Sequence, residues 1–161
     1  MNVDLLSAEL IRDEAMALRL YADSVGKHTI GVGRNLDDVG ISEGEALFML
    51  HNDIDRTMRD LDQHLPFWRS LDEVRQRVLA NMAFNMGIGN DERGLLSFKR
   101  TLILIEAGQF TEAAKSMADS RWATQVGDRA KRLVWMMTTG KDYPLLRRST
   151  DPPIAPPTET A

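Results

Sequence analysis

The chain has 161 residues, of which 43% are hydrophobic and 27% are charged, with a formal net charge of −4. This length allows one domain or two small lobes with a sizeable core, and the mild acidity argues against a nucleic-acid-binding protein. The absence of cysteine excludes disulfides, thiolate zinc sites and cysteine nucleophiles. The three histidines lack the close spacing of a metal-binding helix, so we expect no metal and no cofactor.

No segment reaches the ~18 uninterrupted apolar residues that a membrane span needs. The N-terminal segment "MNVDLLSAELIRDEAM" lacks a basic region followed by an apolar one, so no signal peptide is predicted. We therefore expect a cytoplasmic protein without stable membrane insertion, which leaves the cytoplasm only with outside help.

The first predicted elements are a short helix and a small hairpin. Apolar residues recur at helical spacing over residues 4–14, and the chain looks extended from Leu18 to Tyr21. Gly26 permits a turn in "DSVGKH", and "HTIGVG" then returns as a strand. We expect a hairpin or a three-stranded sheet that "RNLDDVG" closes.

A long helix is predicted over about 43–62, opened by a capping box that Ser42 and Glu45 form. Its opposite ends can serve different cores, so this helix is a candidate link between two lobes. Pro66 ends it because proline cannot continue the hydrogen-bond ladder.

A second capping box, Ser70 with Glu73, opens the next predicted helix, which stops at Gly87. Thr111 is the predicted cap of the second of three later helices. These three helices are expected near residues 97–107, 111–119 and 127–138. Five methionines on the helices are most simply core residues: Met82, Met86, Met117, Met136 and Met137.

Two acids and a threonine surround the predicted hairpin in the spacing Glu-x8-Asp-x5-Thr, which places them at Glu14, Asp23 and Thr29. Two carboxyl groups flanking a cleft can cleave a glycosidic bond, because one protonates the leaving oxygen while the other acts ionised on the sugar or a water. A hydroxyl beside the second acid can hold that water. Acids at this separation are common, so the spacing alone is a weak indication.

Together with later segments, this pattern resembles the catalytic segment of the bacteriophage T4-type lysozymes, endolysins of glycoside hydrolase family 24. Their Glu-x8-Asp-x5-Thr signature includes Thr-Ile-Gly-x-Gly, which "TIGVG" matches. The segments "SLDEVRQRVLANMAFNMG", "GLLSFKRTL", "EAAKSMADSRWATQVGDRAKRL" and "TTGKDY" resemble later parts of that family in the same order. The resemblance therefore runs from about residue 5 to 143.

The resemblance implies an α+β, predominantly helical, lysozyme-like fold over residues 1–143. A small N-terminal β-hairpin lobe, about 14–45, would be joined by the long helix to an all-α C-terminal lobe, about 66–143. The first helix would pack on the C-terminal lobe. The proline-rich segment 144–161 would form a tail.

The same resemblance implies a muramidase that hydrolyses the β-1,4 bond between N-acetylmuramic acid and N-acetylglucosamine with inversion and lyses the host cell. Glu14 would be the general acid, Asp23 would stabilise positive charge at the sugar, and Thr29 would hold the attacking water. Inversion needs the two carboxyl groups about 6.5–9.5 Å apart. The expected partner is bacterial peptidoglycan, and the expected enzyme is a monomer that reaches the periplasmic wall through a separate holin.

Three further residues match positions of the family, and Ser120 is a fourth candidate. Arg129 would pair with the catalytic Glu14, while Asn85 and Phe98 would line the cleft. Asn85 is shorter than the glutamine often found there. Ser120 would either touch substrate or cap a helix.

Two departures from the family stand out. Arg34 replaces the histidine that ends the common "TIGIGH", and Asp53 matches the aspartate that pairs with that histidine. We hypothesise an Arg34–Asp53 ion pair without titration near neutral pH, because arginine stays charged. The short "DDVGI" replaces a longer insertion, which predicts a smaller N-terminal lobe and a more open cleft.

Two other functions stay open. A lytic transglycosylase keeps the acid but needs no water-holding Thr29. A non-catalytic wall-binding or membrane-active module would use basic C-terminal helices, and charge is uneven: residues 1–65 hold 13 acids and 6 bases, whereas residues 66–161 hold 11 acids and 14 bases. The bases that such a module would use are Arg121, Arg129, Lys131 and Arg132.

Overall fold

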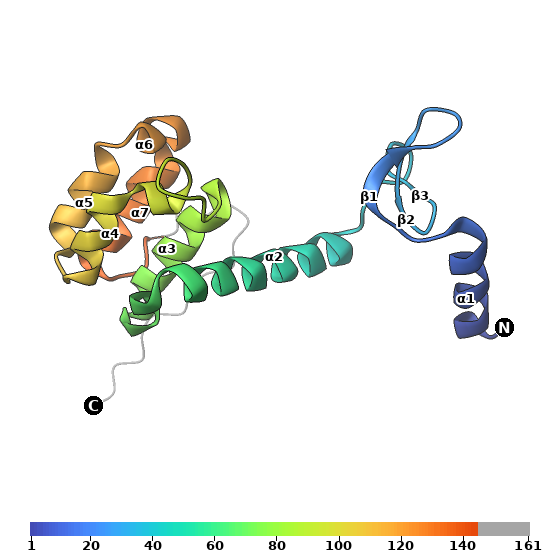
Figure 1. The fold of residues 1–161 in the computed structure, drawn as a ribbon, viewed down its shortest axis with the longest axis horizontal. Helices are drawn as coiled ribbons and strands as arrows, with labels where there is room; N and C mark the ends of the chain where they lie inside the picture. Colours follow the sequence, from blue (N-terminus) through green and yellow to red (C-terminus); the bar gives the residue numbers. More distant parts are fainter. Residues whose placement is uncertain (145–161) are drawn as a thin grey trace. The chain divides into compact units, whose positions relative to one another are not determined.

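The structure is a computed structural model that describes residues 1–144. Of the predicted tail, all but Pro144 lies outside the described residues. Seven α-helices and one small antiparallel sheet make up the described chain, which confirms the α+β, predominantly helical class (Figure 1). The chain divides into two compact units, Met1–Asn52 and Asp53–Ala161.

The first unit contains helix α1 and the sheet. Helix α1 (Val3–Glu14) begins at Asn2, whose side chain accepts the N–H of Leu5 at 3.0 Å. The sheet has the order β1-β2-β3, and both strand pairs are antiparallel, which confirms the expected three-stranded arrangement. Its strands are β1 (Ala17–Ala22), β2 (His28–Gly31) and β3 (Arg34–Asn35).

The predicted long helix is α2 (Glu43–His64), and its capping box is confirmed. The Ser42 hydroxyl accepts the N–H of Glu45 at 3.2 Å, and the Ser42 N–H donates to the Glu45 carboxylate at 2.8 Å. These two bonds satisfy backbone groups that the first turn of a helix leaves free. After α2, Pro66 opens a short 3-10 helix, η1 (Pro66–Ser70).

In its described part, residues 53–144, the second unit contains helices and no strand, and we call it the helical unit. Helix α6 was not predicted, because six residues are too few for a clear apolar repeat. None of the helices in residues 1–144 is both long and apolar enough to cross a bilayer. The elements after η1 are α3 (Glu73–Met86), η2 (Leu95–Ser97), α4 (Lys99–Glu106), α5 (Phe110–Ala118), α6 (Arg121–Val126) and α7 (Asp128–Thr139).

Two predicted helix caps are wrong. Helix α3 begins after Asp72, whose carboxylate accepts the N–H of Arg75 at 3.0 Å. Ser70 instead ends η1, and its hydroxyl donates to the carbonyl of Phe67 at 2.6 Å. Thr111 lies inside the first turn of α5, which starts one residue earlier.

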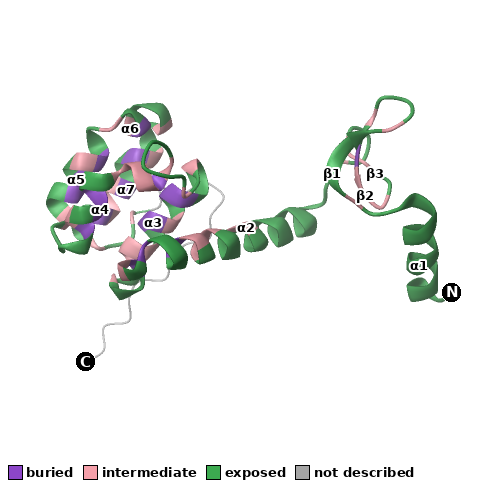
Figure 2. Cartoon of the chain, viewed as in Figure 1, coloured by how far each residue is buried: buried purple, intermediate pink, exposed green. Residues whose placement is uncertain are grey.

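The buried apolar residues of the described chain gather in the second unit (Figure 2). Three of the five methionines predicted to be core residues are fully buried, and the other two pack against the core, so this prediction is confirmed. The fully buried large side chains are Leu61, Leu79, Met82, Leu95, Ile105, Met117, Met137 and Val78.

Arg75 ties the beginning of α3 to the end of α7. Its guanidinium donates to the carbonyls of Met137 at 2.8 Å and Thr138 at 3.2 Å, and lies 3.7 Å from the ring centre of Phe110. A cation at a helix C-terminus satisfies free carbonyls and complements the helix dipole.

We predict that Gly89→Ala destabilises the helical unit far more than Gly108→Ala. Both glycines have positive φ, +68° and +71°, but a Cβ at Gly89 would overlap the carbonyl of Arg93, whereas at Gly108 it meets nothing within 4 Å. The additional loss in the free energy of unfolding should be about 1–3 kcal/mol, which is typical of overpacking. Urea unfolding of both variants measures it, and equal losses would contradict the tight loop at Gly89.

Candidate active site

Glu14 is the last residue of α1, and its carboxylate lies against the turn between β2 and β3. A Cβ built on Gly33 would stand 3.3 Å from the Oε2 of Glu14. Ala15, directly after Glu14, has φ 60° and ψ 172°, a conformation that strongly favours glycine. The chain therefore bends sharply after Glu14, and a residue without a side chain faces the carboxylate.

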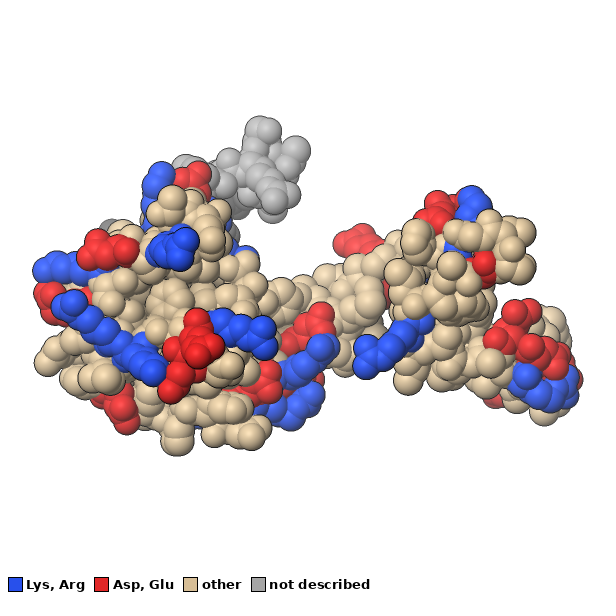
Figure 3. Space-filling model, turned by 45° about the horizontal axis from the view of Figure 1, so that its top comes forward, with Lys and Arg blue, Asp and Glu red and all other residues tan. Residues whose placement is uncertain are grey.

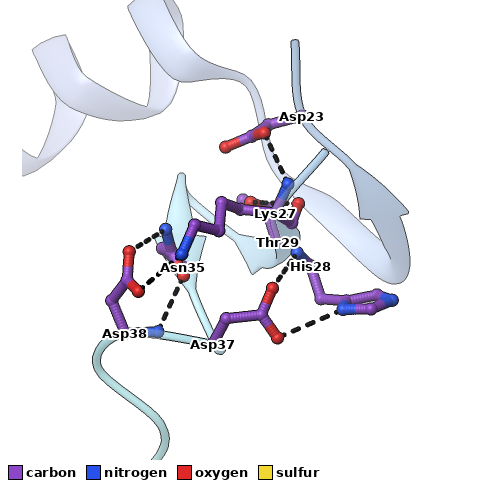
Figure 4. Close-up of polar contacts among 7 residues, drawn as sticks. All are labelled: Asp23, Lys27, His28, Thr29, Asn35, Asp37 and Asp38. Carbon is purple, nitrogen blue, oxygen red and sulfur yellow. Dashed lines mark hydrogen bonds and ion pairs between the residues drawn. The ribbon is translucent and has the colours of Figure 1, made fainter. Parts of the chain in front are cut away.

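Asp23 closes the loop between β1 and β2. Its Oδ1 accepts the N–H of Val25 at 2.9 Å and the N–H of Lys27 at 2.8 Å, and its own N–H donates to the carbonyl of Lys27 at 2.9 Å. Gly26 has φ +83°, which allows this tight turn. Oδ2 has no hydrogen bond among the described residues, so it remains available to a ligand (Figure 4).

Thr29 lies in the central strand, opposite Tyr21 of β1 and Asn35 of β3. It is 4% exposed, and its hydroxyl donates to the carbonyl of Lys27 at 3.3 Å. A hydroxyl whose proton is directed to a carbonyl keeps its lone pairs to accept a hydrogen bond. Thr29 is thus equipped to hold a water molecule.

Asp23 and Thr29 both form hydrogen bonds with the main chain of Lys27. Sequence analysis missed Lys27 because its role rests on backbone atoms. A usable signal was "DSVGK", in which an aspartate before a glycine-containing turn accepts backbone N–H groups further along the chain.

Arg34 has a different partner from the one expected. Its guanidinium makes two bonds to the Glu45 carboxylate, at 2.9 and 3.1 Å, and one to the carbonyl of Gly40 at 3.2 Å. Asp53 instead pairs with Arg56. Asp53 follows Glu45 by eight residues, about 12 Å along a helix, so one guanidinium cannot serve both carboxylates.

Three of the candidate residues, Asn85, Phe98 and Ser120, lie around a tryptophan in the second unit. Asn85 accepts the indole N–H of Trp122 at 2.9 Å, and the Phe98 ring packs edge-on against Trp122 at 6.1 Å. The Ser120 hydroxyl accepts the N–H of Ala123 at 3.1 Å, so Ser120 caps α6. Phe98, Ser120 and Trp122 line a recess of about 370 Å³. Sequence analysis did not single out Trp122, although "SRW" contains it.

Arg129 also has a partner in its own unit. Its guanidinium donates to the side-chain oxygen of Asn81 at 2.8 Å and to the Asn81 carbonyl at 3.2 Å, beside a recess of about 940 Å³. Glu14 belongs to the other unit, so an Arg129–Glu14 pair stays a prediction. The packing of the first helix on the C-terminal lobe also stays a prediction.

The basic residues of the helical unit do not gather into one patch on the face that Figure 3 shows, because acidic side chains lie among them. Lys131 pairs with Asp128 at 2.8 Å, and Lys115 pairs with Glu112 at 2.8 Å. This mixture favours a site built from particular side chains over a purely electrostatic binding surface. Within residues 1–144, no three His, Asp or Glu side chains are grouped to hold a metal ion.

Known proteins match most of this chain. The sequence pattern of the family described as "Phage lysozyme" matches residues 12–136. "Probable T4-type lysozyme 1" and "Probable T4-type lysozyme 2" of Dictyostelium discoideum are each 29% identical, over 80% and 81% of this chain and 90% and 93% of their own length. "Pre-baseplate central spike protein Gp5" of Enterobacteria phage T4 is 30% identical over 86% of this chain, which spans only 28% of that protein.

We predict that Glu45→Gln lowers stability at neutral pH and that the loss shrinks in acid. The bonds from Arg34, followed by those from Ser42, lower the pKa of Glu45 from 4.5 to about 2 in the folded chain. The carboxylate therefore stabilises the fold above pH 4.5, and this stabilisation disappears as the pH falls towards 2.

Urea midpoints of the parent and Glu45→Gln, followed from neutral pH downward, should converge over that range. Glu43→Gln is the matched control, since Glu43 lies in the same first turn and makes no hydrogen bond or ion pair among the described residues. A gap between parent and Glu45→Gln that stays constant into acid would contradict the Arg34–Glu45 assignment.

Proposed function

We propose that this chain, which belongs to the phage lysozyme family, hydrolyses the β-1,4 bond between N-acetylmuramic acid and N-acetylglucosamine in bacterial peptidoglycan. Membership of the family makes its function lysozyme-like. The main support for this specific reaction is that the main chain of Lys27 forms hydrogen bonds with both Asp23 and Thr29. In the same unit, the Glu14 carboxylate lies against the turn at Gly33.

In the proposed reaction, Glu14 gives its proton to the glycosidic oxygen as the bond from the sugar carbon to that oxygen breaks. The free Oδ2 of Asp23 faces the positive charge that develops on the sugar. Thr29 accepts a hydrogen bond from the water that attacks the opposite face of the sugar, and Asp23 takes up the proton that the water loses. Attack from the opposite face inverts the configuration of the sugar carbon.

The proposal extends to the setting of the enzyme. A monomer stays in the host cytoplasm until a separate holin opens the membrane, and it then degrades the periplasmic wall and lyses the cell. This setting is inferred from the resemblance to phage endolysins, and the family match supports the lysozyme-like function on which it builds. The T4 spike protein is longer and carries further regions, so its assembly is not transferred to this chain.

Glu14→Gln should abolish wall hydrolysis, since removing a general acid typically costs about 10²–10⁴ in rate. Clearing of permeabilised Gram-negative cells measures the rate, and mass spectrometry of the products measures the new ends. Hydrolysis gives reducing muramic acid ends, whereas a transglycosylase gives 1,6-anhydro ends.

Asp13→Asn is the control for this variant, because Asp13 is the adjacent carboxylate and pairs with Arg12 at 2.7 Å. It should keep the parental rate. Parental clearing by Glu14→Gln would refute the glycosidase proposal, and anhydro products from the parent would replace it with transglycosylation.

Gly33→Ala should reduce hydrolysis more than Gly31→Ala. The two glycines have nearly equal φ, +68° and +70°, so a side chain is strained equally at both, but only at Gly33 does a Cβ press on the Glu14 carboxylate. Misplacing a catalytic group by 1 Å can lower the rate about 10²-fold. A shift of the Glu14 carboxylate by a few tenths of an ångström should therefore lower the rate about 2- to 10-fold. Equal rates for the two folded variants would show that Gly33 does not set the position of Glu14.

A further inference from the structure

The main chain of Lys27 is the junction between two residues of the proposed reaction. Its N–H donates to Asp23 at 2.8 Å, and its carbonyl accepts the N–H of Asp23 at 2.9 Å and the hydroxyl of Thr29 at 3.3 Å. Any movement of this one peptide segment therefore moves the carboxylate and the hydroxyl together. The main chain of Lys27 therefore connects the two side chains.

The Lys27 side chain is anchored outside the hairpin loop. Its Nζ bonds to Oδ1 of Asp38 at 2.8 Å, and Oδ2 of Asp38 accepts the side-chain amide of Asn35 at 2.9 Å. The Asn35 side chain in turn accepts the N–H of Asp38 at 3.0 Å, and Asn35 lies opposite Thr29 in the sheet. Asp38 thus bonds to both Lys27 and Asn35, as Figure 4 shows, and the strand pairing of Asn35 with Thr29 completes a ring that returns to Lys27.

A second set of contacts holds His28, the residue between Lys27 and Thr29. Asp37 accepts the backbone N–H of His28 at 2.9 Å and lies 3.1 Å from its ring Nδ1, and the carbonyl of His28 accepts the N–H of Leu36 at 2.8 Å. The backbone bond first, and then the ring, keep the pKa of Asp37 below its usual range. Residues 35–38 thus contact both residues that precede Thr29, namely Lys27 and His28.

The Lys27–Asp38 ion pair is expected to contribute little to the stability of the fold. The two side chains are 42% and 58% exposed, and ion pairs this exposed contribute little to the free energy of unfolding. This pair is attached directly to Lys27, whose main chain bonds to both Asp23 and Thr29.

We infer that Lys27 and Asp38 are positioning residues, which hold the Asp23 carboxylate and the Thr29 hydroxyl in place for hydrolysis without touching the substrate. The inference rests on the proposed function for its effect on rate. Its geometric part stands independently, since it states only that the ion pair fixes the Lys27 backbone.

The test compares Lys27→Met, Asp38→Asn and the double variant, with Lys27→Arg as the conservative replacement. Lys115→Met is the matched control, because Lys115 forms another exposed pair at 2.8 Å, with Glu112 on a helix of the other unit. Release of reducing ends from soluble peptidoglycan fragments gives kcat and KM, thermal unfolding gives Tm, and hydrogen exchange gives the protection of the Lys27 amide.

Both single variants should lower kcat about 3- to 10-fold with KM unchanged. The double variant should lose no more than either one, because both remove the same interaction. Lys27→Arg should restore most of kcat, the Tm should move no more than in Lys115→Met, and the Lys27 amide should exchange faster in Lys27→Met and Asp38→Asn than in the parent.

A rise in KM at constant kcat would overturn the inference by making Lys27 a substrate contact. Additive losses in the double variant, or unchanged kcat and unchanged exchange, would also overturn it. An inactive parent with faster exchange in the variants would refute the proposed function while supporting the geometric part. An inactive parent with unchanged exchange would refute both.

Discussion

The closure of the β1–β2 loop by Asp23 on the main chain of Lys27 is the interaction on which the candidate site depends. One carboxylate oxygen accepts two backbone N–H groups, which leaves the other oxygen for a ligand. The carbonyl of the same lysine also receives the hydroxyl of the buried Thr29. The same loop thereby holds two groups of the proposed reaction, and the third, Glu14, lies against the neighbouring turn, where Gly33 has no side chain.

The two units are stabilised by different physical means. The helical unit holds the buried apolar side chains of residues 1–144, packed around fully buried Leu79, Met82 and Met137, and Arg75 fastens its first and last long helices. In the sheet-bearing unit, hydrogen bonds and exposed ion pairs connect the strands, the loops and the start of α2. Such bonds orient the groups that they join but contribute little to the free energy of unfolding.

Sequence reasoning succeeded where the cause is local. The Ser42–Glu45 box opens α2 because its partners are three residues apart. The five methionines are buried or pack against the core because helical spacing places them on apolar faces. The predictions were wrong where two side chains could serve as the same helix cap or the same ion-pair partner. Asp72 displaced Ser70 as the cap of α3, and Glu45 displaced Asp53 as the partner of Arg34, and neither choice can be read from residue types alone.

Most of the helices, the hairpin and the Glu14–Asp23–Thr29 spacing could be read from the sequence, because they follow from periodicity, turn chemistry and order along the chain. Which of these groups lie in contact depends on the folded arrangement. It joined Lys27 to Asp38, His28 to Asp37 and Arg34 to Glu45. Hydrogen bonds act over about 3 Å, and strand register and the course of the loop decide which atoms come that close.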